Sequence, residues 1–172
     1  MIVLRRLPAR QGGLVVPLPL AAATRPLRLR APVAAIGIFD GVHRGHRIIL
    51  RRAAARAKAI GGTPIAITFS PHPLAVLAPQ WVPPLLLSLD QRLAAFQEEG
   101  IRLALVIPFT RAFSLWSPED FVKRLLVKRL RVNEVVVGHD FGFGHGRSGS
   151  IATLRLLGRR FGLSCAWSVR SK

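Results

Sequence analysis

The chain has 172 residues, enough for one domain around a buried core, and its 50% hydrophobic composition excludes a disordered tail. The longest clean apolar stretches, such as 103–107, are far too short to span a bilayer, and a single cysteine excludes an internal disulfide. A formal net charge of +18 favours anionic partners in general, which include nucleotides, nucleic acid and membrane surfaces.

The amino-terminal segment loosely imitates a secretory signal, with arginines ahead of the apolar run 14–23. Pro17 and Pro19 interrupt that run and would break the helix that such a signal adopts, so we expect a cytoplasmic protein without a membrane partner. The single Cys165 suits the same reducing compartment. Basic residues are spread along the chain without a compact block, so we favour solvated helix faces over a nucleic-acid footprint as their interpretation.

The first half of the chain alternates apolar runs with helical patterns. Residues 33–39 form an apolar run ending in glycine and aspartate, which predicts a buried strand. Residues 47–60 carry apolar side chains at helical spacing until two glycines follow, which predicts a helix. Residues 64–69 predict a second strand, and the proline-rich segment 74–87 predicts a loop or flap. A further helix is predicted over 88–100, with a serine or an aspartate as its cap.

The second half continues the alternation. Strands are predicted over 103–108 and 134–138, and a short strand over 163–168. Residues 117–130 begin with Ser-Pro-Glu-Asp, a capping residue followed by proline and two acids, and predict a helix, as do residues 151–161. Because apolar strands alternate with helices, we predict an α/β fold with a Rossmann-like parallel sheet and helices on both faces. Ligands of such sheets bind beyond the carboxyl ends of the strands.

The first candidate site is the connection 37–46 between a predicted strand and a predicted helix. Its glycines allow tight turns, and the helix directs unpaired amides and its positive dipole end at the loop, which suits phosphate. His43 and His46 can project from one side of the turn and donate hydrogen bonds to phosphate oxygens, and a protonated imidazole would add charge. Asp40 either supports this site or caps the turn. Because the loop lacks a cysteine cluster and a third local ligand, we expect no metal site.

The second candidate is the segment 68–73, Thr-Phe-Ser-Pro-His-Pro, after the second predicted strand. Prolines on both sides of His72 restrict its backbone. Phe69 could pack on a flat ring system, or the segment could be an ordinary turn stiffened by proline.

The third candidate is the glycine-rich loop 137–149, after the predicted strand 134–138. Phe141 and Phe143 would be costly to expose, so they either cover the aromatic face of a ligand or cover each other. Asp140 and Arg147 offer polar contacts to a base-like ring and to phosphate, respectively.

The three segments, together and in this order, resemble the amino-terminal FMN adenylyltransferase module of the bacterial bifunctional riboflavin kinase/FAD synthetase family over about 34–161. The two histidines alone resemble the wider HxGH-type nucleotidyltransferases, including pantetheine-phosphate and nicotinamide-mononucleotide adenylyltransferases. Longer motifs narrow the resemblance to the FAD synthetase family. They are Phe-Asp-Gly-Val-His-x-Gly-His, Thr-Phe-x-Pro-His-Pro and Asp-Phe-x-Phe-Gly, together with Pro108-Phe109 and the segment 117–122.

The resemblance implies that ATP and FMN react to FAD and pyrophosphate, with Mg²⁺ accompanying ATP. The attacking phosphate is already an anion, so no general base is required. The implied catalytic residues are His43 and His46, and the implied nucleotide-binding residues are Gly37, Ile38, Phe39, Asp40, Gly41 and Gly45. The implied flavin- or phosphate-binding residues are Phe69, Pro71, His72, Asp140, Phe141, Phe143, Gly144, Arg147 and Ser148.

The chain also departs from that family. Ile38 stands where asparagine is usual, Gly142 where arginine is common, and Ser150 where an acid is usual. No equivalent of the Ile-Ser-Ser-Thr-x-Ile-Arg segment and no riboflavin kinase domain are found. We therefore expect 1–172 to be a single domain with a truncated carboxyl end, and a separate riboflavin kinase or the missing segment as a partner. Loss of one charged donor from a transition-state clamp can lower the rate ~100-fold or more, so we expect weak or no turnover of the chain alone.

Two other functions remain open from the residues. One is a nucleotidyltransferase with a different phosphate acceptor, which quenching of flavin fluorescence would distinguish from an enzyme that binds FMN. The other is a non-catalytic module that binds nucleotides or nucleic acid, and binding of nucleic acid would weaken steeply with salt.

Overall fold

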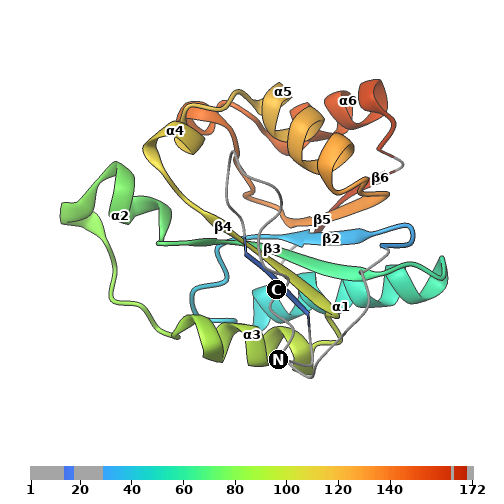
Figure 1. Cartoon of the computed structure of the whole chain (residues 1–172), viewed down its shortest axis with the longest axis horizontal. Coiled ribbons are helices and arrows are strands. Elements are labelled where there is room, and N and C mark those ends of the chain that lie inside the picture. The colour runs from blue at the N-terminus through green and yellow to red at the C-terminus, as the bar shows by residue number, and fades with distance from the viewer. Residues whose placement is uncertain (1–13, 18–28, 164, 170–172) are drawn as a thin grey trace.

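A computed structural model gives the structure of the protein and describes residues 14–17, 29–163 and 165–169. These residues form a six-stranded sheet with the order β1-β4-β3-β2-β5-β6 (Figure 1). The first strand pairs antiparallel with β4, and all the other neighbouring pairs are parallel. The strands are β1 (Leu14–Pro17), β2 (Val33–Ile36), β3 (Pro64–Ser70), β4 (Leu103–Pro108), β5 (Glu134–Gly138) and β6 (Cys165–Val169).

The predicted parallel sheet is confirmed, with one addition and some shifted boundaries. Strand β1 was not predicted, and it occupies the edge position where a strand that ends in proline is tolerated. Strand β2 ends at Ile36, earlier than the predicted end at residue 39, because the backbone of Phe39 is left-handed, with a φ of 53°. Strand β6 begins two residues later and ends one residue later than the predicted 163–168.

Helices cover both faces of the sheet, as predicted. One face carries α1 (Arg44–Ala59) and α3 (Leu89–Glu98), and the other carries the helix 118–129 and α6 (Ile151–Phe161) (Figure 1). Helix α1 begins three residues before the predicted start, because the side chain of His43 caps it. Helix α3 begins with a capping box, in which the side chains of Ser88 and Gln91 each accept a hydrogen bond from the backbone of the other residue.

Several local conformations were not predicted. The helix predicted over 117–130 starts as the short α5 (Pro118–Asp120) and continues as the π-helix η2 (Phe121–Arg129). The predicted loop 74–87 contains most of α2 (Pro73–Leu77) and the 3₁₀-helix η1 (Pro79–Trp81). Two other short helices, α4 (Arg111–Ser114) and the 3₁₀-helix η3 (His145–Arg147), also went unpredicted, because single turns carry no hydrophobic periodicity.

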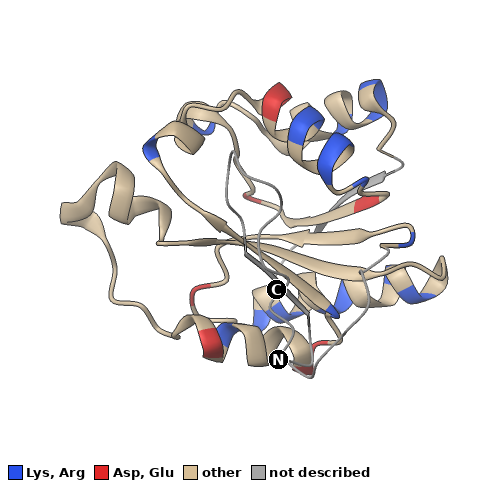
Figure 2. Ribbon diagram, in the orientation of Figure 1, with Lys and Arg blue, Asp and Glu red and all other residues tan. Residues whose placement is uncertain are grey.

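Among the described residues, lysines and arginines lie on helices of both faces of the sheet. Figure 2 shows them on α1 beneath the sheet and on η2 and α6 above it. Within the described part of the chain, no helix combines the length and the hydropathy required to cross a membrane.

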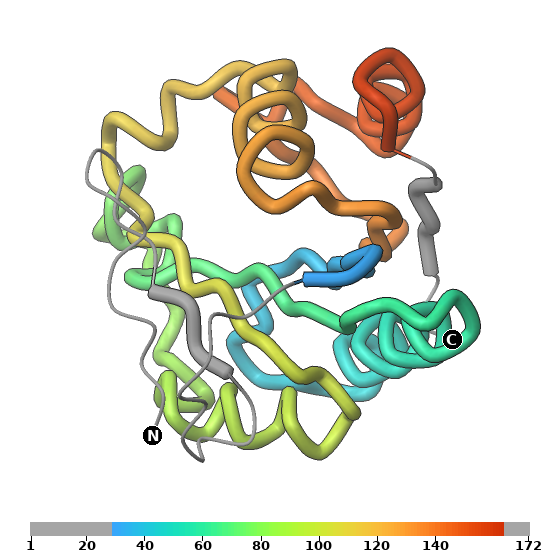
Figure 3. The backbone as a smooth tube through the Cα atoms, turned by 45° about the vertical axis from the view of Figure 1, so that its right-hand side comes forward, coloured from blue at the N-terminus to red at the C-terminus, as the bar shows by residue number. Residues whose placement is uncertain are grey.

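The core consists of two layers of side chains, one on each face of the sheet, and Figure 3 shows the helices that cover each layer. On the face of α1 and α3, the register places Ala35, Ala66 and Ala104 side by side on β2, β3 and β4. Helix α1 turns Ala53 and Ala57, both fully buried, toward the same layer. These small side chains allow α1 to pack closely on the strands whose ends it adjoins.

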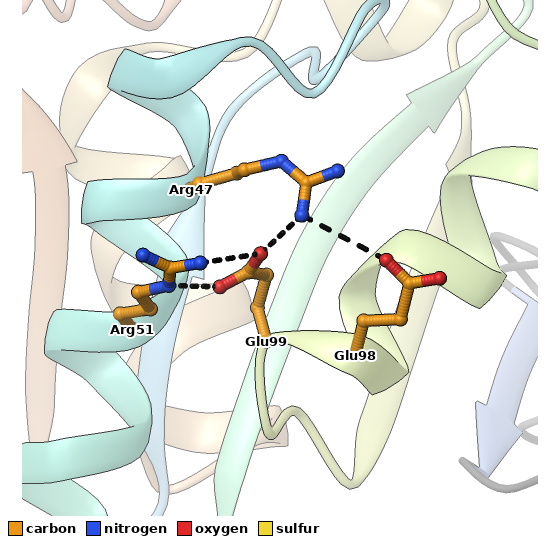
Figure 4. Close-up of polar contacts among 4 residues, drawn as sticks. All are labelled: Arg47, Arg51, Glu98 and Glu99. Atoms are coloured by element: carbon orange, nitrogen blue, oxygen red, sulfur yellow. Dashed lines mark hydrogen bonds and ion pairs between the residues drawn. The ribbon is translucent and has the colours of Figure 1, made fainter.

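A cluster of ion pairs joins α1 to α3 (Figure 4). The carboxylate of Glu99, whose side chain is 2% exposed, accepts hydrogen bonds from Arg47 and Arg51, and Glu98 lies 3.7 Å from Arg47. Burial raises the pKa of Glu99, but the two guanidinium groups outweigh burial and lower it overall. The first two turns of α1 are therefore fixed to the carboxyl end of α3.

A second ion pair fixes the other half of α1. The Nε and Nη2 atoms of Arg56 donate to the two carboxylate oxygens of Glu134 at 2.9 and 2.8 Å. Glu134 is buried at the start of β5, so this bidentate pair joins α1 to the sheet.

Candidate active site

A cavity of about 960 Å³ opens at the carboxyl ends of the parallel strands, where the fold predicts a ligand. Its lining includes the end of β2, the end of β3 and the segment that follows β4. All five histidines of the chain line this cavity: His43, His46, His72, His139 and His145. The three candidate loops of the sequence thus meet around one cavity.

One side of the cavity is the segment 37–46, which comprises the loop after β2 and the first turn of α1, and we call it the histidine wall. His43 caps α1, and its Nδ1 accepts a hydrogen bond from the amide of Gly45 at 3.2 Å. This bond assigns the proton of the neutral ring to Nε2, which becomes the donor available to a ligand. The rings of His43 and His46 are stacked, with their centroids 3.8 Å apart.

His46 lies deeper in the wall than His43. Its Nδ1 is buried without a hydrogen-bond partner, and its ring contacts the edge of Phe39 at a centroid distance of 5.2 Å. Burial and the neighbouring His43 lower the pKa of His46 to about 4, and the carboxylates of Asp40 and Asp140 oppose this shift. The ring is therefore neutral near pH 7 in the free protein, and the charge that a protonated imidazole would add is absent at His46.

The backbone of the histidine wall is held in an unusual shape. Phe39 and Val42 have left-handed φ angles of 53° and 41°, although neither is glycine, and both side chains are buried. Such residues cost of order 1–3 kcal/mol each and persist where tertiary contacts fix them. The ring of Phe39 lies over Gly37, where a Cβ would approach the ring to 3.0 Å, so position 37 has no room for a side chain.

An arginine that the sequence analysis missed lies behind the histidine wall. Arg92 extends from α3, is 6% exposed, and donates from Nη1 to the carbonyl of Ile38 at 3.0 Å. The hydroxyl of Thr68 donates to the same carbonyl at 2.8 Å. The signal was present in the sequence, because Arg92 shares the helical spacing of the buried Leu93 and Phe96 on the apolar face of α3.

The opposite side of the cavity is a group of rings that we call the aromatic wall, formed by Phe69, Phe109, Phe113 and Trp116. Phe113 lies at its centre, with centroid distances of 6.0 Å to Phe69, 5.7 Å to Phe109 and 5.1 Å to Trp116. Of these four rings, only Phe69 was a predicted site residue. The spacing of Phe109, Phe113 and Trp116 directly after β4 was the missed signal, because that segment leaves the carboxyl end of a parallel strand.

The loop 139–147 adds a second pair of rings beside the aromatic wall. Phe141 and Phe143 are stacked with their centroids 5.4 Å apart, and Phe143 also contacts Phe121. Both stacked rings line the cavity. They cover each other, as one of the two sequence interpretations had it, and still present surface to a ligand.

Further polar side chains line the cavity outside the histidine wall. His72 caps α2 through its Nδ1, which accepts from the amide of Leu74 at 3.2 Å. The guanidinium of Arg147 donates to the backbone carbonyl of Asp140 at 3.2 Å and passes 3.0 Å from where a Cβ on Gly142 would lie, so a larger residue there would displace Arg147. Arg111, which was not predicted, also lines the cavity.

Three predicted site residues lie outside the cavity lining, and the other predicted residues belong to it. Gly41 faces Leu86, and the hydroxyl of Ser148 donates to the carbonyl of His145 at 2.8 Å. Pro71 is exposed at the start of the turn that leads to α2. Within the described residues, no group of three or more histidine, cysteine, aspartate or glutamate side chains could hold a metal ion.

Comparison with known proteins agrees with the resemblance seen in the sequence. The family described as FAD synthetase matches residues 26–170. The bifunctional riboflavin kinase/FMN adenylyltransferase of Escherichia coli K12 is 37% identical over 130 residues, which are 76% of this chain and 42% of the relative. The relative of the same name from Pseudomonas fluorescens is 38% identical over 129 residues. A relative from Geobacillus thermodenitrificans, whose name joins the same two activities, is 35% identical over 133 residues, or 77% of this chain and 72% of the relative.

A solved structure shares the fold. The crystal structure of a macrolide-efflux protein from Streptococcus pneumoniae superimposes with a TM-score of 0.69 at 23% identity, over 81% of this chain and 44% of that one. At this identity the likeness concerns the fold alone. The chain spans about 42% of the length of the Escherichia coli relative. The family match over 26–170 and the coverage of the Geobacillus relative establish that this chain belongs to the FAD synthetase family.

Proposed function

We propose that this chain transfers the adenylyl group of ATP to FMN and forms FAD and pyrophosphate. The observation that carries the proposal is a single cavity in which a histidine-capped helix start faces a wall of aromatic rings. The helix start suits phosphate, and the rings suit a flat ring system. The names of the relatives include this activity.

The reaction requires no base and no redox partner. An oxygen of the FMN phosphate attacks the α-phosphorus of ATP and forms a new phosphorus–oxygen bond. The bond between that phosphorus and the oxygen that bridges to the β-phosphorus breaks, and pyrophosphate leaves with the electron pair. Because the attacking phosphate is already ionised near neutral pH, the protein has to align the two substrates and stabilise negative charge.

The histidine wall supplies that stabilisation. The Nε2–H of His43 and the neutral ring of His46 donate to oxygens of the α-phosphate or the leaving pyrophosphate, and the first amides of α1 add their dipoles. We assign His43 and His46 as catalytic residues. The nucleotide-binding residues of the same wall are Gly37, Ile38, Phe39, Asp40 and Gly45.

The aromatic wall supplies the contact area for the flavin ring. Phe69 and Phe113 offer ring faces, and the neighbouring Phe141 extends this surface. Arg111 and Arg147 are the lining guanidinium groups on this side, and we assign them to the FMN phosphate.

Magnesium belongs to this scheme as part of the ATP substrate. Mg²⁺ prefers phosphate oxygens and water, supplemented by one or two carboxylates. Asp40 and Asp140 are the carboxylates that line the cavity, so they are the residues able to contact a Mg²⁺–ATP complex. We expect FMN to come from a riboflavin kinase activity, which the names of the relatives join to FMN adenylyltransferase.

The test is formation of FAD from FMN and Mg²⁺–ATP by the purified chain, followed by chromatography, with FMN binding followed separately by quenching of flavin fluorescence. The proposal predicts quenching, FAD, and release of one pyrophosphate for each FAD. The phosphate-free analogue riboflavin is the matched control, because it presents the same ring without an attacking phosphate. Quenching without FAD would reject the enzyme and leave a flavin-binding domain, and no quenching would reject the cavity as the flavin site.

A further inference from the structure

We propose that Arg92 is a positioning residue, which holds the histidine wall against the end of β3 in the geometry that adenylyl transfer requires. The inference rests on the proposed function, and it assigns a role to a residue that lies outside the cavity lining. Arg92 acts through the backbone of the wall and does not touch the substrates.

The contacts of Arg92 join two segments that are distant in the sequence. Its Nη1 donates to the carbonyl of Ile38 at 3.0 Å and lies 3.4 Å from both the hydroxyl of Thr68 and the carbonyl of Phe69. Thr68 donates to the same Ile38 carbonyl. One nitrogen of Arg92 therefore links Ile38 of the histidine wall to the last residues of β3, where the aromatic wall begins.

The environment of Arg92 is a poor one for stability alone. Its side chain is buried, its Nε has no hydrogen-bond partner, and its hydrogen-bond acceptors are two carbonyls and a hydroxyl. Burial lowers the pKa of Arg92, and the carboxylate of Asp40 offsets part of that shift. A buried cation with neutral partners is less favourable for folding than an apolar side chain of similar size. We therefore attribute the presence of Arg92 to its hydrogen bond with the histidine wall and not to a gain in folding stability.

Helix α3 is also joined to the site through Glu99 at its carboxyl end, and this contact differs from the one that Arg92 makes. Glu99 binds Arg47 and Arg51, which belong to α1, so it fixes the helix that carries His46 and not the loop 37–43 that precedes it. Arg92 is the group of α3 that bonds to the loop itself.

Loss of the hydrogen bond between Arg92 and the Ile38 carbonyl would release the loop next to Phe39, whose backbone is left-handed. Ile38 directly precedes Phe39, whose left-handed backbone sets the ring against which His46 packs. Without the bond to the Ile38 carbonyl, the loop can relax and the donors of His43 and His46 move relative to the α-phosphate. A misplacement of about 1 Å can lower turnover ~100-fold. The aromatic wall retains its ring contacts, so FMN binding is preserved.

The test compares Arg92→Met and Arg92→Lys with Leu126→Ala, a fully buried position in the core layer on the other face of the sheet. For Arg92→Met we expect kcat to fall ~100-fold while KM for FMN changes less than about two-fold. Arg92→Lys keeps the charge and one donor and should recover about ten-fold of that loss. Leu126→Ala loses stability but should keep kcat at temperatures below its melting point.

A second measurement does not depend on turnover. Histidine NMR signals, followed against pH, report the titration of His46, whose pKa lies at about 4 because the ring is buried. Relaxation of the loop should move that titration upward in Arg92→Met, partly in Arg92→Lys, and not in Leu126→Ala.

The outcomes separate the two proposals. If the wild-type chain forms no FAD, the proposed function fails, and the His46 titration still tests whether Arg92 positions the wall. An unchanged titration in Arg92→Met, or a loss of kcat in proportion to lost stability as in Leu126→Ala, would overturn the positioning role. A shifted titration with unchanged kcat would overturn it as well. If Arg92→Met does not fold, Arg92→Lys is compared with the wild type: an upward shift of the His46 titration together with a lower kcat supports the positioning role, and the absence of either overturns it.

Discussion

The two walls of the cavity are built on different physical principles. The histidine wall is a backbone structure, with left-handed residues at Phe39 and Val42, a capped helix start, and a buried arginine behind it. The aromatic wall consists of side chains on β3, α4 and their flanking segments, joined by ring contacts at 5.1–6.0 Å. The first fixes donors in space, and the second offers apolar surface.

This difference matches the demands of the two halves of the proposed reaction. Charge that develops on phosphate is stabilised by donors fixed in place before the reaction, and small displacements reduce that effect strongly. Binding of a flat ring depends mainly on buried area and tolerates small displacements. Substitutions in the histidine wall should therefore lower turnover, and substitutions in the aromatic wall should lower affinity for FMN.

The largest expected effect follows from removal of one donor of the histidine wall. Asparagine at position 43 keeps a cap for α1 but lacks the Nε2 donor, so His43→Asn separates catalysis from folding. We expect kcat to fall ~100- to 1,000-fold, with KM for FMN little changed, in a steady-state assay of FAD formation. A rise in KM for FMN with unchanged kcat would contradict the assignment of turnover to the histidine wall and of FMN affinity to the aromatic wall.

The next largest effect concerns the centre of the aromatic wall. Phe113→Ala removes the ring that contacts Phe69, Phe109 and Trp116. Stacking of a base on an aromatic ring contributes roughly 1–3 kcal/mol, so KM for FMN should rise ~10- to 100-fold and flavin quenching should weaken accordingly. Phe113→Trp, which keeps a flat ring, is the matched control. Equal FMN affinity in Phe113→Ala and the wild type would remove the aromatic wall from the flavin site.

A smaller effect is expected at the ion pairs behind the histidine wall. Glu99→Gln removes the charge that pairs with Arg47 and Arg51, and because both arginines are partly exposed, the free energy of unfolding should fall by about 1–2 kcal/mol. Glu98→Gln changes an exposed neighbour on the same helix and should leave stability unaltered. Chemical denaturation of both variants measures the difference, and equal midpoints would show that the buried pair contributes nothing.

The last effect is confined to acidic pH and is a pH dependence of stability from His46. Its folded-state pKa of about 4 lies below the ordinary 6.5, so the unfolded chain binds the proton more tightly. The stability that neutral His46 provides is present above pH 6.5 and is lost as pH falls toward 4. Melting temperatures measured across this range should fall less steeply for His46→Gln than for the wild type. Parallel curves would place the His46 pKa near its ordinary value.

The sequence predicted five of the six strands in the described residues, and the three site loops, because both depend on local patterns. Apolar runs locate β3, β4 and β5, and the glycine and histidine residues of 37–46 locate the helix start that faces the ligand. The π-helical continuation of the helix 118–129 has no local signature in the sequence.

The parts that went unpredicted depend on tertiary contacts. The aromatic wall forms because the segment after β4 passes beside the end of β3. This neighbourhood follows from the order of the strands in the sheet, which the local sequence does not reveal. Arg92 is an arginine on an apolar helix face, and its role follows from the loop that lies opposite. The low pKa of His46 likewise depends on burial, which the motif cannot report.

The most direct test of the two-wall cavity is a crystal structure of the chain with FMN and a non-hydrolysable Mg²⁺–ATP analogue. The account predicts that the triphosphate lies at the start of α1, within hydrogen-bond distance of His43, and that the isoalloxazine ring contacts Phe113 and its neighbours. A flavin ring bound at the histidine wall, or a triphosphate bound away from the start of α1, would contradict it.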